Sequence, residues 1–308
     1  MSKNKITQTM GPVAWGMLIL LSIVWGCTFF FQEIAVKELP VFTIVAMRVV
    51  LAATILFGIL AAARESLPRG WKVWRELALL ALINNVIPFC LIVWGQKEIA
   101  SGLASILNAT TPVFTVLVAH FVTTDEKLSS MKLIGVISGL LGATILIGVE
   151  LLEGLGTAVI AQVAVLGAAL SYGISAIYGR RFLAMGITPT ATATGQLTAA
   201  SFILVPVALV FDAPWRLQPP APATIAAVIG LASVSTALAY YLYFRILKKV
   251  GATNLMLVTF LIPVSALALG IFVLEETLMI QHVIGLLFIG LGLAFLDGRL
   301  FNRTKRNP

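Results

Sequence analysis

Polar side chains that could bind a small solute recur within the apolar stretches of this sequence. They are amides, hydroxyls and phenols, namely Asn84, Asn85, Asn108, Thr111, Tyr172, Ser175, Tyr178, Tyr240 and Tyr241. Amides and hydroxyls can hydrogen-bond both an ammonium group and a carboxylate, and aromatic rings accept an apolar group or stack on a cation. The set therefore favours a binding site for a small zwitterion. The alternative is that these groups bond neighbouring helices to one another, at about 0.6 kcal/mol per bond.

Arg48 is the one basic residue that lies well inside an apolar stretch. A charge in the bilayer interior is costly unless it is paired. The sequence leaves two partners open, Glu33 near the end of the preceding stretch or the carboxylate of a bound substrate. No Asp or Glu falls in the middle of any stretch. Because a carrier that exchanges solute for protons needs a buried carboxylate, we expect facilitated diffusion or solute exchange instead.

The stretches that hold these residues have the length and composition of membrane-spanning helices. Of the 308 residues, 59% are hydrophobic and only 11% charged, and the mean hydropathy is +1.02. A run of about 20 apolar residues crosses a hydrocarbon core of ~30 Å as a helix. We expect an all-α polytopic membrane protein with ten spans, near residues 13–35, 41–63, 76–96, 101–122, 131–149, 159–180, 190–211, 223–245, 253–274 and 281–298.

The distribution of basic residues supports this count. Of the 21 Lys and Arg, 17 fall in the terminal segments and connections of one side of the membrane, against Lys37, Lys97 and Arg216 on the other. Basic connections stay in the cytoplasm, which predicts that both termini are cytoplasmic. The net charge of +8 is then a topology signal, and it does not predict a nucleic-acid partner.

The sequence also repeats itself. Eight residues of the segment 126–148 recur unchanged 150 positions later, and Pro112-Val113 recurs as Pro263-Val264. Each half then holds five spans, an odd number, so the second half enters the membrane from the side opposite to the first. Inverted repeats of this kind are typical of secondary transporters, because two related packings can open to opposite sides.

Two prolines occupy equivalent places in the halves. Pro112 and Pro263 are expected near the middle of the fourth and ninth spans. A proline removes one backbone hydrogen bond and kinks a helix, and the freed carbonyl must find another partner. The two prolines are either hinges that let the helices close over a cavity or static kinks, and the sequence leaves both readings open.

Several motifs resemble those of EamA domains. In the first half these are WGCTFF from Trp25, Pro40, Arg48 and ILNATTPVFTVLVAHFVTTDEKLS, and in the second the segment from Pro263 through Glu276 to Gly292. Together the two halves cover nearly the whole chain and resemble the ten-span drug/metabolite transporter superfamily. Within it, the chain looks most like the YddG-type exporters of amino acids.

The resemblance implies an architecture and a function. The repeats would comprise residues 13–149 and 159–298, followed by a cytoplasmic tail, 299–308. The first four spans of each half would line a central cavity and the fifth would pack outside. Such proteins export small metabolites, here foremost neutral or aromatic amino acids, across the bacterial inner membrane without a cofactor. The second half departs from the pattern, since Gln196 stands roughly where Arg48 would be expected.

Other functions find less support. A membrane enzyme would need metal-binding acids, a His–Glu zinc spacing or a phosphate-cradling glycine loop, and the sequence contains none of these motifs. A carrier of phosphorylated metabolites or nucleotide sugars would need several buried cations, where only Arg48 is present.

Two further features have structural interpretations. Glu126 and Glu276 are expected to stabilise the start of the span that follows each of them, by facing the positive end of its dipole. Span five carries a face of small residues, Gly135, Ser138, Gly139 and Gly142, where another helix, including that of a second copy in a homodimer, could pack.

Overall fold

The computed structural model describes residues 11–124, 128–147, 156–255 and 258–297. In the first half of the chain the helices are α1 (Pro12–Ala35), α2 (Val41–Ala62), α3 (Trp71–Ala81), η1 (Leu82–Val86), α4 (Ile87–Gly95), α5 (Ser101–Asn108), α6 (Thr111–Val122) and α7 (Ser130–Ile147). In the second half they are α8 (Thr157–Ala184), α9 (Pro189–Phe211), η3 (Pro214–Arg216), α10 (Pro222–Ala232), η4 (Ser233–Leu238), α11 (Ala239–Leu255), α12 (Val258–Leu274) and α13 (Ile280–Asp297). Throughout the described ranges, the regular structure is helical.

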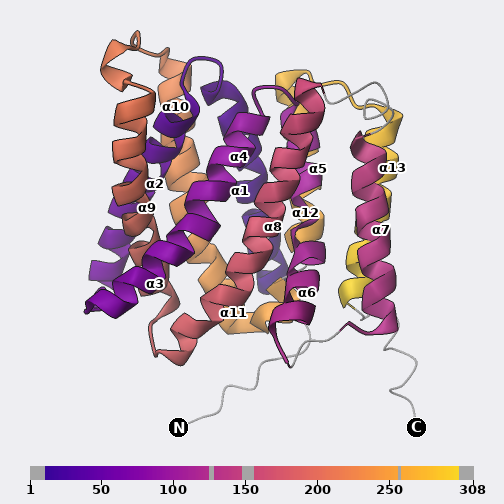
Figure 1. Ribbon diagram of the computed structural model, residues 1–308, viewed down its shortest axis with the longest axis horizontal. Coiled ribbons are helices and arrows are strands. Elements are labelled where there is room, and N and C mark those ends of the chain that lie inside the picture. Colours follow the sequence, from indigo (N-terminus) through magenta and orange to yellow (C-terminus); the bar gives the residue numbers. More distant parts are fainter. Residues whose placement is uncertain (1–10, 125–127, 148–155, 256–257, 298–308) are drawn as a thin grey trace.

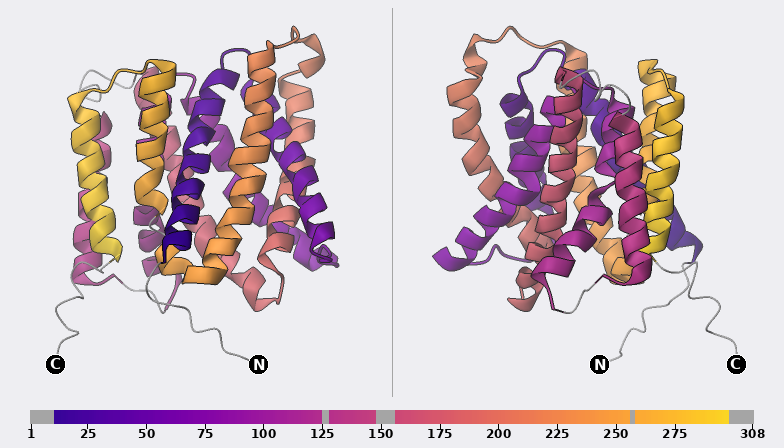
Figure 2. Two further views of the ribbon diagram at one scale, coloured as in Figure 1. Left: turned by 180° about the vertical axis from the view of Figure 1, so that it is seen from behind. Right: turned by 45° about the vertical axis from the view of Figure 1, so that its right-hand side comes forward.

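Most helices coincide with the expected membrane spans, but α11 continues to Leu255, beyond the expected end of the eighth span at residue 245. Seven helical stretches of 22 to 28 residues are long and apolar enough to cross a bilayer, and three shorter apolar helices lie in α7, α12 and α13. Span three consists of α3, η1 and α4, span four of α5 and α6, and span eight of α10, η4 and α11. The helices run side by side, and α1 begins at the same end of the bundle at which α13 ends (Figures 1 and 2). The all-helical polytopic fold predicted from hydropathy is confirmed.

Several helix pairs join one half of the chain to the other. Helix α1 packs on α12, as its counterpart α8 packs on α6, and α2 packs on α9. Glycines allow the close approach in the first two pairs. A Cβ on Gly26 would collide with Ser265, and one on Gly173 would lie 2.9 Å from the backbone nitrogen of Thr115. Trp25-Gly26 in α1 and Tyr172-Gly173 in α8 therefore lie at equivalent helix crossings.

The fifth span of each half packs outside the main bundle. Helices α7 and α13 stand next to each other at one side of the molecule (Figure 1). A Cβ on Gly142 would lie 2.8 Å from the carbonyl oxygen of Gly285, and Ser138 donates a hydrogen bond of 2.8 Å to the carbonyl of Phe288. The small-residue face of span five is thus covered by α13 of the same chain. The expectation that another helix packs on this face is confirmed, since α13 of the same chain covers it, and a homodimer through span five stays a prediction.

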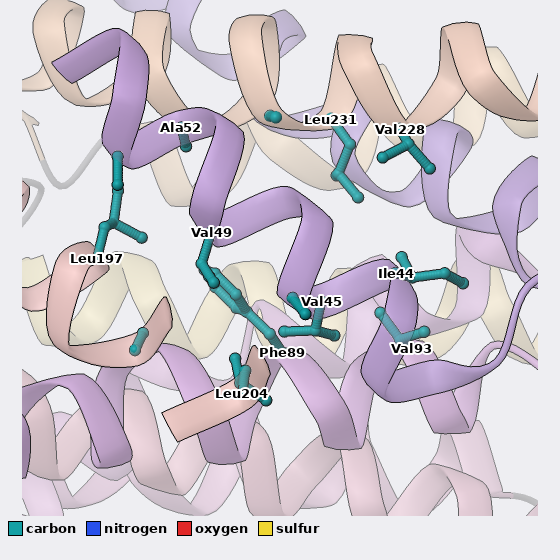
Figure 3. Close-up of a cluster of buried hydrophobic side chains, with 14 of the residues drawn as sticks. Ile44, Val45, Val49, Ala52, Phe89, Val93, Leu197, Leu204, Val228 and Leu231 are labelled. Atoms are coloured by element: carbon teal, nitrogen blue, oxygen red, sulfur yellow. The ribbon is translucent and has the colours of Figure 1, made fainter. Parts of the chain in front are cut away.

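An apolar core surrounds the middle of α2. Figure 3 shows Val45 and Val49 of α2 among Phe89, Leu204 and Leu231, which come from α4, α9 and α10. These side chains are almost completely buried. Arg48 lies on the same helix between the two valines, so its backbone is held by a core to which both halves contribute.

The two prolines sit in different local structures. Helix α5 ends at Asn108 and α6 begins at Thr111, so Pro112 starts a new helix in the middle of span four. The Asn108 carbonyl, which Pro112 cannot bond, accepts a hydrogen bond of 2.7 Å from the Thr111 hydroxyl. Pro263 is instead the sixth of the 17 residues of α12, which continues through it. Of the two prolines, Pro112 therefore lies at a break between helices, whereas Pro263 lies inside a continuous helix.

Candidate functional site

Spans three and eight each contain a π-helical segment at equivalent places. The segment η1 begins at Leu82 and η4 at Ser233, which is the spacing of 151 that also separates Pro112 from Pro263. A π-turn inserts one residue into a helix, is rare, and is often found at functional sites. Polar residues occupy both segments, Asn84 and Asn85 in η1 and Ser235 and Thr236 in η4.

Each π-segment is tied to a neighbouring helix by a serine. The Ser171 hydroxyl of α8 donates to the carbonyl of Ile83 in η1 at 2.6 Å. The Ser235 hydroxyl of η4 donates to the carbonyl of Val24 in α1 at 2.8 Å. Since α8 is the counterpart of α1, the same junction is closed in both halves, with the direction of donation reversed.

The amide of Asn84 lies at the centre of a hydrogen-bonded cluster. Its Nδ2 donates to Gln196 Oε1 at 3.2 Å and approaches the Tyr240 hydroxyl at 3.4 Å, and its Oδ1 accepts from the Ser175 hydroxyl at 2.8 Å. Gln196 Nε2 in turn donates to the Tyr240 hydroxyl at 2.8 Å. The cluster joins η1, α8, α9 and α11, so both repeats contribute to it. Asn84 and Tyr240 keep partial exposure, whereas Ser175 and Gln196 are buried.

Arg48 lies near Tyr240 and has no carboxylate partner among the described residues. It is only 5% exposed. Its Nε donates to the Thr236 hydroxyl at 2.9 Å, and its guanidinium carbon lies 3.7 Å from the centroid of the Phe89 ring. Tyr172 and Tyr240 lie within electrostatic reach of its charge.

The proposed ion pair between Arg48 and Glu33 does not form. The Glu33 carboxylate is 3.5 Å from Gln96 Nε2, and Gln96 also donates to the carbonyl of Phe29 at 2.9 Å. Glu33 therefore belongs to a polar group between α1 and the end of α4. Among the described residues, Glu33 is therefore not the partner of Arg48.

Asn85, like Gln32 of α1, is a buried amide whose two polar side-chain atoms both lack a hydrogen-bond partner among the described residues. It comes near the Tyr240 hydroxyl without a hydrogen bond of ordinary geometry. A buried unbonded amide costs about 1–3 kcal/mol, so a polar partner such as water or a solute is expected here.

The remaining polar residues singled out from the sequence lie elsewhere or play another part. The Tyr178 hydroxyl donates to Glu76 Oε2 at 2.7 Å, and the Arg181 guanidinium lies 3.6 Å over the Tyr178 ring, so this tyrosine ties α8 to α3. Tyr241 stacks on Arg245 at 4.5 Å.

Tyr172 borders the Arg48 site, while Asn108 and Thr111 belong to the break in span four. Tyr172 packs against the apolar core around α2 and against a second buried apolar cluster. Its carbonyl lies 2.8 Å from Ser175 Oγ. Asn108 and Thr111 bond to each other, and no hydrogen bond of the described residues joins them to Asn84 or Arg48. We therefore define the polar centre as Arg48, Asn84, Asn85, Tyr172, Ser175, Gln196, Thr236 and Tyr240.

Three members of this arrangement were not identified as site residues from the sequence. They are Gln196, Thr236 and, beneath the guanidinium, Phe89. A signal for Thr236 was present, because Asn85 plus the repeat spacing of 151 is position 236. Gln196 was recognised as the counterpart of Arg48, and the structure supports that reading. Each of the two side chains bonds a π-segment of the other repeat, Arg48 that of η4 and Gln196 that of η1.

Glu276 stabilises a different helix from the expected one. Its two carboxylate oxygens accept from the backbone N–H groups of Ser101 and Gly102, at 2.8 and 2.9 Å, at the start of α5 in the other repeat. The expectation that it faces the start of the following span is therefore wrong. The connection after α12 folds back so that the backbone N–H of Glu276 bonds the carbonyl of Gly270, and this aims the side chain at α5. The equivalent Glu126 lies outside the described residues.

The same kind of contact recurs at this end of the bundle. Asp212, after α9, accepts hydrogen bonds from the backbone N–H and the hydroxyl of Thr43 in the first turn of α2, at 2.6 and 2.9 Å. Glu38, after α1, accepts from the backbone N–H of Ala221 before α10 at 2.8 Å. In each pair the acid belongs to one repeat and the helix start to the other.

A hollow of about 360 Å³ lies away from the polar centre. It is apolar, and Phe57 of α2 and Phe202 of α9 are among its lining residues. Both phenylalanines are exposed at the surface of the bundle. This hollow matches the lipid-facing side of a membrane protein and not a polar binding site.

Comparison with known proteins agrees with this architecture. The model of the EamA-like transporter family matches twice, at residues 13–148 and 159–296. The chain belongs to this family. It is 26% identical over 292 residues to the "Uncharacterized transporter YoaV" of Bacillus subtilis, covering 94% of this chain and 97% of the relative. It is 24% identical over 287 residues to the "Probable amino-acid metabolite efflux pump" of Escherichia coli, covering 90% and 92%.

The fold itself has a solved counterpart. One crystal structure superposes with a TM-score of 0.66 at 18% identity and covers 97% of this chain and 100% of the other. At that identity the likeness concerns the fold alone. This EamA-family chain is thus an integral membrane protein of a transporter family, with two family repeats whose polar residues meet at one centre.

Proposed function

We propose that this EamA-family protein exports small metabolites that carry a carboxylate, amino acids foremost, by alternating access. The proposal places it in the bacterial inner membrane with both termini in the cytoplasm, as the asymmetry of basic residues predicts. Neutral or aromatic amino acids, the cargo of YddG-type exporters, are the favoured substrates within this class. A relative named as an amino-acid metabolite efflux pump supports the same choice.

The observation that carries the proposal is the state of Arg48. Its guanidinium is buried, held on one side by Thr236 and stacked on Phe89, and no acid of the described residues neutralises it. A buried unpaired charge is expensive in a membrane protein and marks a functional site. A guanidinium offers five donors in a fork that fits a carboxylate, so the terminal nitrogens can bind the acidic group of a substrate.

The rest of the polar centre suits the other parts of an amino acid. The amide oxygen of Asn85 is unbonded and can accept from an ammonium group, and the partly exposed Tyr172 and Tyr240 can contact an apolar or aromatic side chain. No carboxylate contacts this centre in the described parts of the chain. We therefore propose facilitated movement or solute exchange without tight proton coupling.

Transport by the purified protein in liposomes tests the proposal. Radiolabelled amino acids, beginning with L-phenylalanine, are screened for uptake, and the variant Arg48→Gln is compared with the wild type at equal reconstituted amounts. A charge-assisted hydrogen bond contributes about 1.5–3 kcal/mol, so R48Q is expected to lower kcat/KM by roughly 10- to 150-fold. Arg181→Gln is the matched control, because Arg181 pairs with Glu76 outside the polar centre, and its uptake should equal that of the wild type.

Three outcomes would contradict the proposal. One is R48Q protein, present at normal yield, that transports L-phenylalanine and other amino acids as fast as the wild type. A second is uptake that follows an imposed pH gradient, which would show the proton coupling that the polar centre does not predict. The third is efficient competition by a sugar phosphate or nucleotide sugar, which would favour a carrier of multiply charged anions.

A further inference from the structure

We propose that Thr236 is a positioning residue that holds Arg48 in the orientation in which its terminal nitrogens meet a substrate carboxylate. The inference deepens the proposed function and rests on it. It also assigns a direction to the bound solute, with the carboxylate toward η4 of the second repeat and the ammonium toward the amides of η1 in the first.

The hydroxyl of Thr236 both donates and accepts a hydrogen bond. It donates its proton to the carbonyl of Leu231, five residues earlier, at 2.8 Å, and accepts from Arg48 Nε at 2.9 Å. A hydroxyl has one proton, so donation to Leu231 leaves its lone pairs as acceptors for the guanidinium. The acceptor carbonyl, that of Leu231 in α10, lies five residues before Thr236, which is the spacing of the backbone hydrogen bonds in a π-turn. The local geometry of η4 therefore orients the acceptor that orients Arg48.

Two contacts then define the plane and rotation of the guanidinium. Stacking on Phe89 at 3.7 Å fixes the plane, and the Nε bond to Thr236 fixes the rotation within that plane. Both contacts leave the two terminal nitrogens unbonded among the described residues. A planar fork that is held by its inner nitrogen is preorganised for a bidentate carboxylate, which reduces the entropy lost on binding.

The equivalent junction of the other repeat differs in its contact and in its chemistry, because Gln196 bonds Asn84 and not Asn85, the residue at the place of Thr236. Gln196 takes the place of Arg48 and bonds Asn84 of η1 at 3.2 Å, while Asn85 on the same segment keeps both amide atoms unbonded. The junction at η4 thus holds a cation, Arg48 of α2, whereas η1 presents neutral amides. A solute with a carboxylate and an ammonium group has complementary partners in only one direction along this axis.

Substitution of Thr236 separates positioning from simple structural support. The probes are L-phenylalanine and L-phenylalaninamide, which has the same skeleton and ammonium group without the carboxylate charge. In liposomes that contain the full-length protein, Thr236→Val should raise the KM for L-phenylalanine by roughly five- to tenfold with kcat little changed, the effect of about one hydrogen bond. Inhibition of uptake by L-phenylalaninamide should keep its wild-type strength.

Two variants on the same segment serve as controls. Thr236→Ser retains the hydroxyl and should restore the wild-type ratio of the two probes. Ser235→Ala removes the neighbouring hydroxyl, which bonds the carbonyl of Val24 and not Arg48, and should leave this ratio unchanged. In the double variant R48Q/T236V, the valine should add no further loss of discrimination, because the hydroxyl acts through the arginine.

The outcomes distinguish the two proposals. If R48Q abolishes the preference for the carboxylate and T236V leaves it intact, the positioning role is refuted and the proposed function stands. If R48Q itself leaves the preference unchanged, both proposals fall. If the valine variant does not reach the membrane, Thr236→Ala carries the same prediction, and equal losses for both probes in that variant would show a structural role and overturn positioning.

Discussion

Replacing Glu276 with glutamine should loosen the start of α5, which is in the other repeat. The carboxylate accepts from two backbone N–H groups, those of Ser101 and Gly102, at 2.8 and 2.9 Å. Helix α5 has no side-chain cap of its own. Glutamine keeps the length of the side chain but offers one acceptor oxygen in place of two, and it carries no charge for the helix dipole.

The size of the effect follows from these contacts. Loss of one hydrogen bond to a charged group costs about 1.5–3 kcal/mol, loss of a helix cap about 0.5–2 kcal/mol, and loss of the dipole interaction about 0.3–1 kcal/mol. These contributions overlap, and Glu276 is partly exposed to solvent. We therefore expect the free energy of unfolding to fall by about 2 kcal/mol in E276Q.

Two measurements in detergent micelles check this expectation. Reversible denaturation gives the change in the free energy of unfolding, and hydrogen exchange followed by mass spectrometry reports on the amides of Ser101 and Gly102. Both amides should exchange faster in E276Q. The matched control is Glu275→Gln, because the adjacent Glu275 is exposed and makes no hydrogen bond with the described residues.

The reasoning is refuted if E276Q unfolds within about 0.5 kcal/mol of the wild type and the two amides keep their protection, since surface substitutions without a specific contact fall in that range. An equal loss of stability in E275Q would also refute it, because it would show an effect of charge at this end of the bundle and not of the cap.

Two further predictions concern the glycines and prolines. Gly142→Ala should lower the free energy of unfolding by about 1–3 kcal/mol, because its Cβ would lie 2.8 Å from the carbonyl oxygen of Gly285 in α13. Gly290→Ala is the control, since a Cβ there meets open space and should leave stability nearly unchanged. Denaturation of both variants checks this prediction. Pro112→Ala should slow initial uptake into liposomes more than Pro263→Ala, because Pro112 lies at a helix break and Pro263 inside a continuous helix; equal rates for both variants and the wild type would remove any hinge role.

Much of the fold could be predicted from the sequence because the bilayer imposes simple local rules. A helix must be about 20 apolar residues long to cross the hydrocarbon core, whatever its neighbours are, and basic residues mark one side. The repeat was visible because glycine and glutamate recur at a spacing of 150 and proline at a spacing of 151. Trp25-Gly26 and Tyr172-Gly173 lie at equivalent places in the two repeats, and the structure explains their glycines as close helix crossings.

The kinds of residue in the candidate site could be predicted from the sequence, but which individual residues belong to it could be predicted less well. Polar residues in spans are expected to face other protein groups, which singled out Arg48, Asn84 and Tyr240. The periodicity of a regular helix does not show where a π-turn shifts the register, so the convergence on η1 and η4 could not be derived. Tyr178 and Tyr241 have the same side chain as Tyr240 but lie outside the polar centre. Tyr178 bonds Glu76, which is distant in the sequence, and Tyr241 contacts Arg245, four residues further on.

The sequence by itself determined that this chain crosses the membrane as two inverted repeats and that Arg48 lies inside a span, where a charge needs a partner. Hydrophobicity, charge and repetition are properties of the chain, and they act before any tertiary contact forms. Only the tertiary structure decided that Glu33 is not that partner, that Glu276 caps a helix of the other repeat, and that Arg48 meets Thr236. Hydrogen bonds act over about 3 Å, so their partners depend on how distant segments pack. That packing cannot be predicted from the local sequence.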